Sequence, residues 1–257
     1  MNVVAFVRAP TESLARCELT HLERAPIDVA RARAQHAAYA AALDELGAEI
    51  EWLPPLPDHP DALFVEDTAI VLPELAIITR PGAESRRGEV LSVANALSRH
   101  RGLAWIEAPA TLDGGDVLVI GRTIFVGLTT RTNADGVAAL RAMVRPHQYE
   151  AVSVPIGRSL HLKSACTYIP PVIVVANREW IDPAIFGGMN VIATHDSEPA
   201  AGCTLTLGGC TLVQASAPRT EERLRSAGVK TRALDVSELQ KAEAGLTCMS
   251  LLVSTAP

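Results

Sequence analysis

Three residues that lie far apart in the sequence have side chains that could together break a carbon–nitrogen bond. Cys248, in LTCMS, could supply a thiolate, a strong nucleophile when a neighbouring cation or a bound cationic substrate lowers its pKa. His161, in LHLKS, could donate a proton to a leaving amine and then activate water. Asp113, in LDGGD, could hold the imidazole by accepting its other N–H. Taken singly, such residues are more often a buried thiol, a satisfied histidine and a turn residue, so the hypothesis requires that they meet in the fold.

Acidic and basic residues elsewhere predict the charge of the reacting molecule. Glu66 and Asp67, in FVED, with Asp61 just upstream, would repel a thiolate, but their carboxylates would pair with a planar cation such as a guanidinium. Arg86, in SRR, and Arg131, in TRTN, could bind a carboxylate, although a solvated surface charge is the ordinary alternative for each. Together these residues favour an arginine-like substrate, with a guanidinium at one end and a carboxylate at the other.

The residues of this chemistry recur at nearly even intervals, which indicates an internal repeat. Five short apolar strands each open with a polar residue, at steps of 47, 48, 42 and 45 positions: Glu66, Asp113, His161, Cys203 and Cys248. This spacing is typical of propellers and repeat arrays. In a propeller the first strand of each unit lies nearest the axis, so these side chains would converge at one end of a central channel.

Each repeat reads as a strand–strand–helix–strand unit. In the first unit, strands over residues 66–72 and 75–79 precede a helix that Ser85 would cap. In the second unit, Asn133 would cap the helix. The third unit is less regular, because Pro183 falls in its helix region.

The fifth unit is split between the two ends of the chain. Residues 246–253 and 3–7 supply two strands, a helix runs from its cap Asp28 to Leu46, and residues 49–53 close the unit. The sequence therefore predicts an α/β fold, a five-bladed α/β propeller of five ββαβ units closed by both termini, which forms a single catalytic domain over residues 1–257. From periodicity alone, an ordinary two-layer α/β domain is the alternative.

Composition indicates a soluble, cytoplasmic globular protein. The 257 residues carry a formal charge of -6, with 48% hydrophobic and 20% charged residues, which excludes bulk disorder. No apolar run approaches the roughly 18–20 residues of a membrane span. We read no signal peptide, and without a Lys/Arg block we expect no nucleic-acid partner. The widely spaced cysteines lack zinc-type spacing and are expected to be reduced: Cys17, Cys166, Cys203, Cys210 and Cys248.

At these residues the sequence resembles the dimethylarginine dimethylaminohydrolases, a family of the pentein (guanidino-group-modifying) superfamily. The matching stretches follow the family order and spacing from Val7 to Val253: FVRAPTESL, DVARARAQHAAY, FVEDTAIV, ITRPGAESRR, LDGGDVL, VGLTTRTN, LHLKS and LTCMS. The resemblance implies the five-bladed propeller and a covalent mechanism in which Cys248 is the nucleophile, His161 the general acid/base and Asp113 its partner. The substrate contacts that it implies are Glu66 and Asp67 for the guanidinium, Arg86 and Arg131 for the carboxylate, Asp61 and the backbone around Leu19 for the α-amino group, and Ser164 near the histidine.

The implied reaction is hydrolysis of asymmetric dimethylarginine or monomethylarginine to citrulline and dimethylamine or methylamine, through a thiouronium on Cys248 and without a metal or organic cofactor. Many family members approach the nucleophile through DGLLTC, whereas this chain reads EAGLTC, so Glu243 and Ala244 could alter how the alkylated end is received. The segment Leu14–Leu19 is a candidate lid over the amino acid end. Bacterial relatives suggest a homodimer.

Three alternatives are compatible with the same sequence features. An arginine deiminase would use the same chemistry on unmethylated arginine, although members of that class usually carry a helical insertion for which this chain has no room. Another guanidine or amidine hydrolase on this scaffold is the second alternative. A non-catalytic pentein, such as a translation initiation factor or a methylarginine-binding protein, is the third, and the initiation factor reading predicts loss of the Cys/His/acid set that this chain retains. The sequence leaves the preference among arginine substrates open.

Overall fold

Fifteen β-strands form five three-stranded sheets in the computed structural model, which describes residues 2–255. In each sheet a first strand pairs antiparallel with a middle strand, and the middle strand pairs parallel with an outer strand. The first strands are β3 (Ala69–Val71), β6 (Val117–Ile120), β9 (Cys166–Ile169), β12 (Leu205–Leu207) and β15 (Ser250–Thr255). The middle strands, in the same order, are β4 (Ala76–Ile78), β7 (Thr123–Leu128), β10 (Ile173–Ala176), β13 (Cys210–Gln214) and β1 (Asn2–Val7). The outer strands are β5 (Leu103–Trp105), β8 (Glu150–Pro155), β11 (Asn190–Ala193), β14 (Thr231–Leu234) and β2 (Ala48–Trp52).

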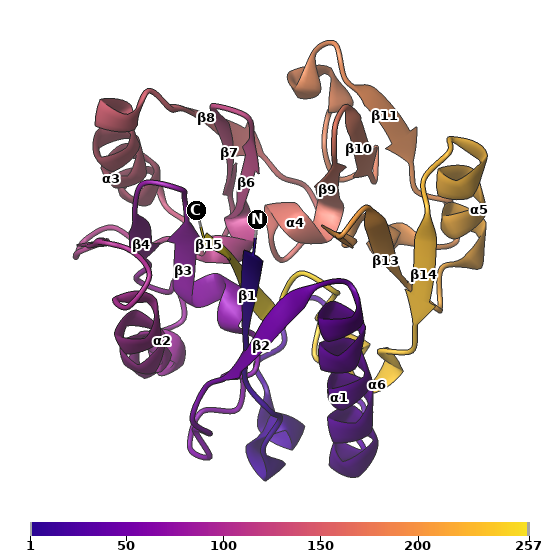
Figure 1. Ribbon diagram of the computed structural model, residues 1–257, viewed down its shortest axis with the longest axis horizontal. Coiled ribbons are helices and arrows are strands. Elements are labelled where there is room, and N and C mark those ends of the chain that lie inside the picture. Colours follow the sequence, from indigo (N-terminus) through magenta and orange to yellow (C-terminus); the bar gives the residue numbers. More distant parts are fainter. Residues whose placement is uncertain (1, 256–257) are drawn as a thin grey trace.

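Four of the five sheets have an α-helix between the middle and outer strands, as a parallel connection requires. These helices lie at the outside of the molecule (Figure 1): α2 (Val90–Leu97), α3 (Ala134–Val144), α5 (Pro218–Ser226) and α1 (Val29–Glu45). The third unit departs from the predicted pattern, because its connection holds only a 3₁₀ turn over Pro183–Phe186. Proline fixes φ and lacks an N–H, so it is tolerated at the start of this short turn but would interrupt a longer helix.

The predicted helix caps are confirmed at two of three positions. The Asp28 carboxylate accepts the N–H of Arg31 at 3.0 Å, and the Asn133 side chain accepts the N–H of Gly136 at 2.8 Å. Ser85 is not a cap: a 3₁₀ turn over Glu84–Glu89 precedes α2, and the Ser85 hydroxyl donates to the carboxylate of Glu18. The prediction failed because a cap needs a helix beginning directly after it, and here the α-helix begins at Val90.

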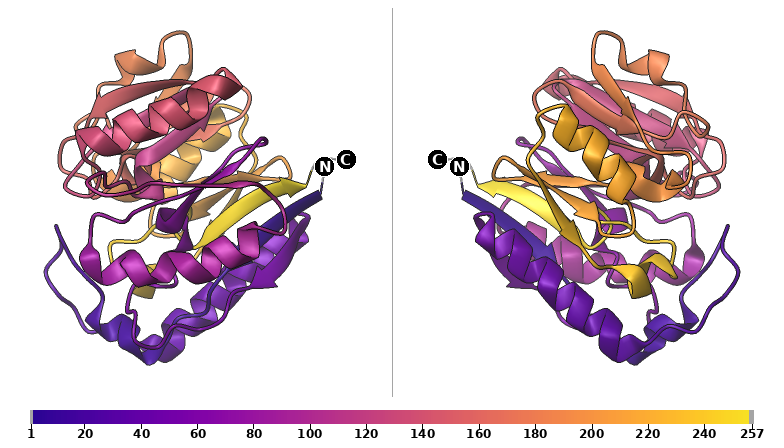
Figure 2. Two further views of the ribbon diagram at one scale, coloured as in Figure 1. Left: turned by 90° about the vertical axis from the view of Figure 1, so that its left-hand side faces the viewer. Right: turned by 90° about the vertical axis from the view of Figure 1, so that its right-hand side faces the viewer.

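The two ends of the chain form one sheet. β15 pairs antiparallel with β1, so that Thr255 lies opposite Asn2, and β1 pairs parallel with β2. Figure 2 shows the N- and C-termini side by side. The ends of the predicted domain, residues 1 and 256–257, lie outside the described residues. Among residues 2–255, none of the helices combines the length and the apolar character needed to cross a membrane.

All five first strands line one cavity of about 260 Å³. Each strand contributes side chains to its wall, for example Ile70, Leu118, Tyr168, Thr206 and Leu252. Two short helices complete the described α-helices: α4 (Leu162–Ala165) precedes β9 and α6 (Ser237–Gln240) precedes the turn to β15. The first strands of all five sheets therefore meet around one shared cavity.

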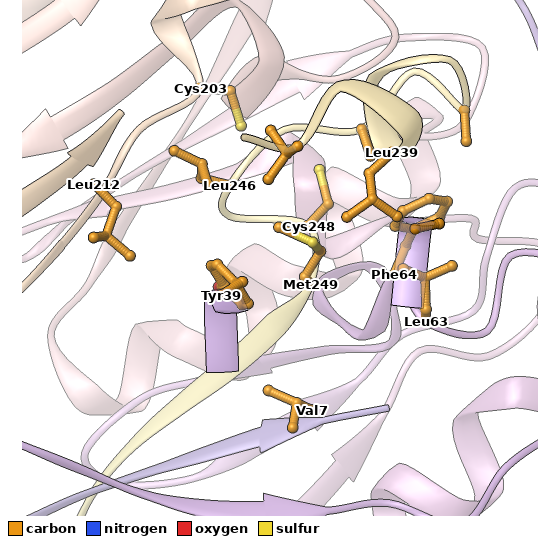
Figure 3. Close-up of a cluster of buried hydrophobic side chains, with 14 of the residues drawn as sticks. Val7, Tyr39, Leu63, Phe64, Cys203, Leu212, Leu239, Leu246, Cys248 and Met249 are labelled. Carbon is orange, nitrogen blue, oxygen red and sulfur yellow. The ribbon is translucent and has the colours of Figure 1, made fainter. Parts of the chain in front are cut away.

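The largest apolar cluster surrounds the start of β15. Figure 3 shows Cys248 and Met249 among the side chains of Phe64, Leu239 and Leu246, which come from different parts of the chain. Residues of α1 and β1 complete this cluster. Close packing on several sides holds the segment before β15 in one position, which fixes the thiol of Cys248.

Candidate active site

The polar residues of the predicted repeat lie just before the first strands, in tight turns. Glu66 belongs to the 3₁₀ turn Val65–Thr68, Asp113 directly precedes a 3₁₀ turn, and His161 directly precedes α4. The strand predicted over residues 66–72 accordingly begins later, at Ala69. The Thr68 hydroxyl donates to the carbonyl of Val65 at 2.7 Å and closes the turn. Glu66 and Asp67, which are consecutive in this turn, line different cavities.

Cys248, His161 and Asp113 are brought together at a small pocket. Cys248 and His161 both line it, and Nε2 of His161 lies 3.0 Å from Oδ2 of Asp113. The other oxygen of Asp113 accepts the N–H of Gly82 at 2.9 Å, which fixes the carboxylate. All three side chains are buried, so a reaction at the thiol would occur away from bulk water.

Several carboxylates determine the protonation state of His161. Burial by itself lowers its pKa, but the carboxylates of Asp67, Asp116 and Asp113 outweigh burial and raise the pKa to about 10. The imidazole is therefore protonated at neutral pH and can act as an acid. Asp116 also has a structural role, because its Oδ1 accepts the N–H of Leu162 at 3.0 Å.

The thiol of Cys248 is held in its neutral form. The neighbouring Cys203 thiol, then burial, then the nearby carboxylates of Glu66 and Asp67 raise its pKa well above the ordinary value. The N–H of Gly245 points at the sulfur, with N and Sγ 3.3 Å apart. A cation placed beside the sulfur would oppose these effects, so the site is built to form the thiolate only when a cationic ligand is bound.

Two glycines allow the backbone to approach these side chains closely. A Cβ on Gly115 would lie 2.6 Å from Oδ1 of Asp67 and 2.7 Å from Nδ1 of His161, and a Cβ on Gly114 would lie 2.0 Å from the carbonyl oxygen of Glu66. The N–H of Gly115 donates to Oδ1 of Asp67 at 3.0 Å. The DGGD motif therefore places the general acid, its partner and a second carboxylate in contact, which a side chain at either glycine would prevent.

Glu66 and Asp67 face different neighbours. The carboxylate of Glu66 pairs with Nζ of Lys163 at 2.6 Å and accepts the hydroxyl of Thr247 at 2.8 Å, and these three residues line the central cavity. The carboxylate of Asp67 lines the pocket of Cys248. Of the two predicted guanidinium-binding acids, only Asp67 is therefore among the residues that line this pocket. The N–H of Glu66 donates to the carbonyl of Cys248 at 3.1 Å and ties the two segments together.

Arg86 is buried in a network of acids behind the pocket. Its Nη1 lies 2.5 Å from Asp67, and its Nη2 lies 2.9 Å from Glu89. Burial lowers the pKa of Arg86, but the carboxylates of Glu89 and Asp67 raise it well above the ordinary value, so the guanidinium stays charged. Arg86 lines the pocket as predicted, while most of its donors are directed at protein oxygens, including the carbonyl of Phe64 at 2.9 Å.

Arg131 and Asp61 line the same pocket, and both contact Glu18. The carboxylate of Glu18 lies 3.4 Å from Nη1 of Arg131. The N–H of Glu18 is 3.2 Å from Oδ2 of Asp61, whose pKa burial raises to about 6. Asp61, which was predicted to contact the substrate's α-amino group, therefore accepts the N–H of the residue that precedes Leu19.

The predicted lid, Leu14–Leu19, overlaps an exposed loop only at its end and is otherwise partly anchored in the core. Within Leu14–Leu19, Leu14 and Cys17 are fully buried core residues, so this part of the chain is anchored. The exposed segment is residues 18–26, which we call the cap loop. It is held by the carboxylate of Glu243, which accepts the N–H groups of Thr20 at 3.0 Å, His21 at 2.5 Å and Leu22 at 2.6 Å.

Two predicted residues lie beside the pocket and are not among the residues that line it. Ser164 lines a neighbouring, mainly apolar cavity of about 120 Å³ together with Trp180, and its N–H donates to the carbonyl of His161 at 3.2 Å. Leu19 is half-buried against the apolar cluster. Glu243 and Ala244 border both cavities. Glu243 has a left-handed backbone with φ of 59°.

Three charged residues that pair with the predicted site residues were not predicted from the sequence: Lys163, Glu89 and Glu18. Lys163 lies within the LHLKS motif, two positions after the histidine, and Glu89 lies one turn after Arg86, so spacing could have indicated both. Glu18 offered no motif. In the described part of the chain, Asp67, Asp113 and His161 each offer a possible metal-ligand atom, and these atoms lie within 4.8 Å of one another.

The chain was compared with known proteins. The N(G),N(G)-dimethylarginine dimethylaminohydrolase of Streptomyces coelicolor is 42% identical over 249 residues, covering 96% of this chain and 95% of that protein. The protein of the same name from Pseudomonas aeruginosa is 35% identical, with 96% and 97% covered. A human protein named putative hydrolase DDAH2 is 32% identical, with 98% and 95% covered. No protein-family model matches the chain.

Solved structures show the same similarity. The dimethylarginine dimethylaminohydrolase of Pseudomonas aeruginosa, as a mutant complexed with citrulline, superposes with a TM-score of 0.94 at 32% identity, covering 98% of this chain and 100% of that chain. The N-terminal domain of a cyanobacterial arginine dihydrolase has a TM-score of 0.89 at 17% identity, with 99% and 98% covered, which shows a shared α/β fold.

Proposed function

The chain belongs to the dimethylarginine dimethylaminohydrolase family, and from this we propose that it hydrolyses Nω-methylated arginines to citrulline and dimethylamine or methylamine. The observation that carries the proposal is the meeting of Cys248, His161 and Asp113 at one buried pocket whose other end holds Arg131 and Asp61. Such a pocket has a reactive end suited to a cation and an amino acid end suited to a carboxylate and an amine.

We propose that the five sheets are the blades of a closed propeller and that residues 1–257 form one catalytic domain. Two observations support this. First strands from all five sheets line a common cavity, and β15 with β1 joins the chain ends in one sheet. A closed ring removes sheet edges that would otherwise be open to pairing with other chains.

The residues divide into a reactive end and an amino acid end. At the reactive end, Asp67 binds the guanidinium, and Arg86 positions Asp67 by its ion pair. At the amino acid end, Arg131 binds the carboxylate with Arg86 behind it, and Asp61 and the backbone near Leu19 bind the α-amino group. Glu66 supports the site indirectly, because its carboxylate binds Lys163 and Thr247, the residue before Cys248. Ser164 supports the backbone of His161, and Glu243 holds the cap loop closed over the bound substrate.

In the first half of the reaction, the amine leaves. The guanidinium stabilises the thiolate, and the thiol proton passes to solvent. The sulfur attacks the guanidinium carbon, the carbon–nitrogen bond to the alkylated nitrogen breaks, and the His161 imidazolium gives its proton to the departing amine. A pKa near 10 keeps this acid protonated at neutral pH. The product is a thiouronium on Cys248.

In the second half, water releases citrulline. His161, now neutral, takes a proton from water, and the water oxygen attacks the thiouronium carbon. The carbon–sulfur bond breaks, Cys248 leaves as a thiolate, and the remaining hydroxyl proton passes to solvent as the citrulline carbonyl forms. Each step uses residues of this chain, and the proposal includes no metal or organic cofactor.

The proposal is tested by citrulline formation from asymmetric dimethylarginine, monomethylarginine and arginine, each with the wild type, Cys248→Ser and Cys210→Ser. Cys210 is a buried thiol on β13 that is not among the residues lining the pocket, so its variant controls for loss of a cysteine. We expect turnover of the methylated substrates by the wild type and Cys210→Ser, and a fall on the order of 10⁴-fold or more for Cys248→Ser.

Two results would contradict the proposal. Preference for plain arginine would make the protein a deiminase on the same scaffold. Turnover of none of the three substrates would leave another guanidine substrate or a binding role. The homodimer and the cytoplasmic location stay predictions, and light scattering of the purified protein would test the first.

A further inference from the structure

Glu18 makes the two contacts that the amino acid end of a substrate would need. Its backbone N–H points at the carboxylate of Asp61, 3.3 and 3.2 Å from the two oxygens, where an α-amino group would be received. Its own carboxylate lies 3.4 Å from Arg131, where an α-carboxylate would be received. Glu18 thus offers Asp61 and Arg131 an N–H donor and a carboxylate, the same two kinds of group that the amino acid end of a substrate would offer them.

Further contacts hold Glu18 and Arg131 in this arrangement. The Arg131 side chain is only 12% exposed, and its Nη2 also donates to the hydroxyl of Thr20 on the cap loop at 3.3 Å. The other carboxylate oxygen of Glu18 accepts the Ser85 hydroxyl. Glu18 itself lines the pocket and occupies the groups of Asp61 and Arg131 that an amino acid would use. A molecule that bound both groups would therefore have to displace Glu18.

We infer that Glu18 is an internal ligand of the amino acid end, which substrate displaces from Arg131 and Asp61 and which returns to displace citrulline. The inference rests on the proposed function, because it takes Arg131 and Asp61 as the contacts of the substrate's amino acid end. The Glu18 carboxylate occupies Nη1 of Arg131 and so competes with the carboxylate of substrate and product alike for this donor.

The direct test is Glu18→Gln, which keeps the backbone N–H on Asp61 and removes only the negative charge. A partly exposed ion pair corresponds to about a two- to five-fold change in an equilibrium constant. We expect KM for asymmetric dimethylarginine and the inhibition constant of citrulline to fall together by about this factor. Glu23→Gln makes the same charge change on an exposed residue of the same loop and should leave both constants unchanged.

A double-mutant cycle identifies the partner. In the Arg131→Gln background the fork is gone, so adding Glu18→Gln should change KM no further, although Arg131→Gln alone raises it. Glu18→Asp keeps the charge on a shorter side chain and should lie between the wild type and Glu18→Gln. Thermal unfolding of each variant separates these effects from loss of fold.

Each contrary result has a distinct meaning. If the wild type forms no citrulline from any substrate, the proposed function fails. If the wild type is active and Glu18→Gln raises KM, Glu18 binds the substrate's ammonium group and the inference is overturned. It is equally overturned if Glu18→Gln has no effect, or if its effect persists in the Arg131→Gln background.

Discussion

At the scale of single residues, three carboxylates around one imidazole decide when the site can act. Asp67, Asp113 and Asp116 keep His161 protonated despite its burial. The neighbouring Cys203 thiol, burial and the carboxylates of Glu66 and Asp67 keep Cys248 as a neutral thiol. In the proposed mechanism the acid is therefore ready before substrate arrives, while the nucleophile forms with the substrate's cation. This order limits attack by the thiolate on other electrophiles.

Removing one of these carboxylates should move the pH profile in a defined direction. In Asp113→Asn the imidazolium loses a stabilising negative charge, so the pKa of His161 falls from about 10 and the acid is lost at a lower pH. We expect the alkaline limb of kcat/KM to shift to lower pH and kcat to fall by about 10²-fold or more. Asp135→Asn, the same change on an exposed residue at the start of α3, should leave the limb in place. An unshifted limb in Asp113→Asn would contradict the role of this carboxylate.

The close approach at Gly115 gives a second test at this scale. In Gly115→Ala the new methyl group would collide with Asp67 and His161, both held by buried partners, so we expect loss of most activity. Gly102→Ala is the matched control, because no atom lies within 4 Å of the position of its Cβ. Citrulline formation and the melting temperature of both variants provide the measurement. Full activity of Gly115→Ala would show that the turn can relax.

At the scale of elements, the middle of the cap loop is attached through one carboxylate from another part of the chain. Its residues are exposed, apart from half-buried Leu19, and Glu243 accepts three of its consecutive N–H groups. Glu18 at its start contacts Asp61 and Arg131, and the carbonyl of Pro26 at its end accepts Nζ of Lys241 at 3.0 Å. Because its side chains other than Leu19 lie outside the apolar core, such a loop can open without disturbing that core. The departure of EAGLTC from the family pattern thus has a structural meaning in this chain, since it places a longer acid beneath the loop.

Glu243→Ala should release the cap loop. Alanine has the same left-handed strain at this position as glutamate, so the change reports on the lost carboxylate. We expect faster amide exchange at residues 20–22 and a rise in KM of about tenfold, since bonds to charged acceptors are the stronger ones. Glu222→Ala, on the exposed side of α5, is the control. Unchanged exchange at these amides would show that other contacts hold the loop.

At the scale of the whole molecule, the site exists because segments before four of the five first strands meet at one centre. Segments preceding β3, β6, β9 and β15 supply the acids, the histidine and the cysteine, while the chain ends are sealed together by β1 and β15. The order in which the sheets follow one another along the chain matters less than their packing around the shared cavity. Joining the ends and opening the chain elsewhere should therefore preserve the site.

A circular permutant tests this expectation. A short Gly/Ser linker can join the chain ends beyond Asn2 and Thr255, which face each other in one sheet, with new ends between the exposed Gly187 and Gly188. We expect kcat/KM within about threefold of the wild type, since linkers of this length carry a small entropic cost. A permutant opened between Thr132 and Asn133, beside Arg131, should lose activity. Equal loss in both permutants would argue against closure of the fold by the two termini.

The sequence by itself determined much of this protein. Regular spacing of polar residues before apolar strands predicted the three-stranded units, and local signals such as the Asp28 and Asn133 caps located helices, because caps and periodicity act within a few residues. Residue type and motif were sufficient to nominate Cys248, His161 and Asp113, since a nucleophile, an acid and its partner each need a particular functional group.

Only the tertiary structure decided which charged residues pair with one another and which cavity each of them faces. Adjacent in sequence, Glu66 and Asp67 face the central cavity and the pocket respectively, from a 3₁₀ turn that precedes β3. Arg86 proved to be a buried partner of Asp67, and Glu18, which no motif marked, reached Arg131 across the fold. Ion pairs and burial depend on distances between segments that are remote in the chain, so pKa values and pocket contacts follow from packing and cannot be read from local sequence.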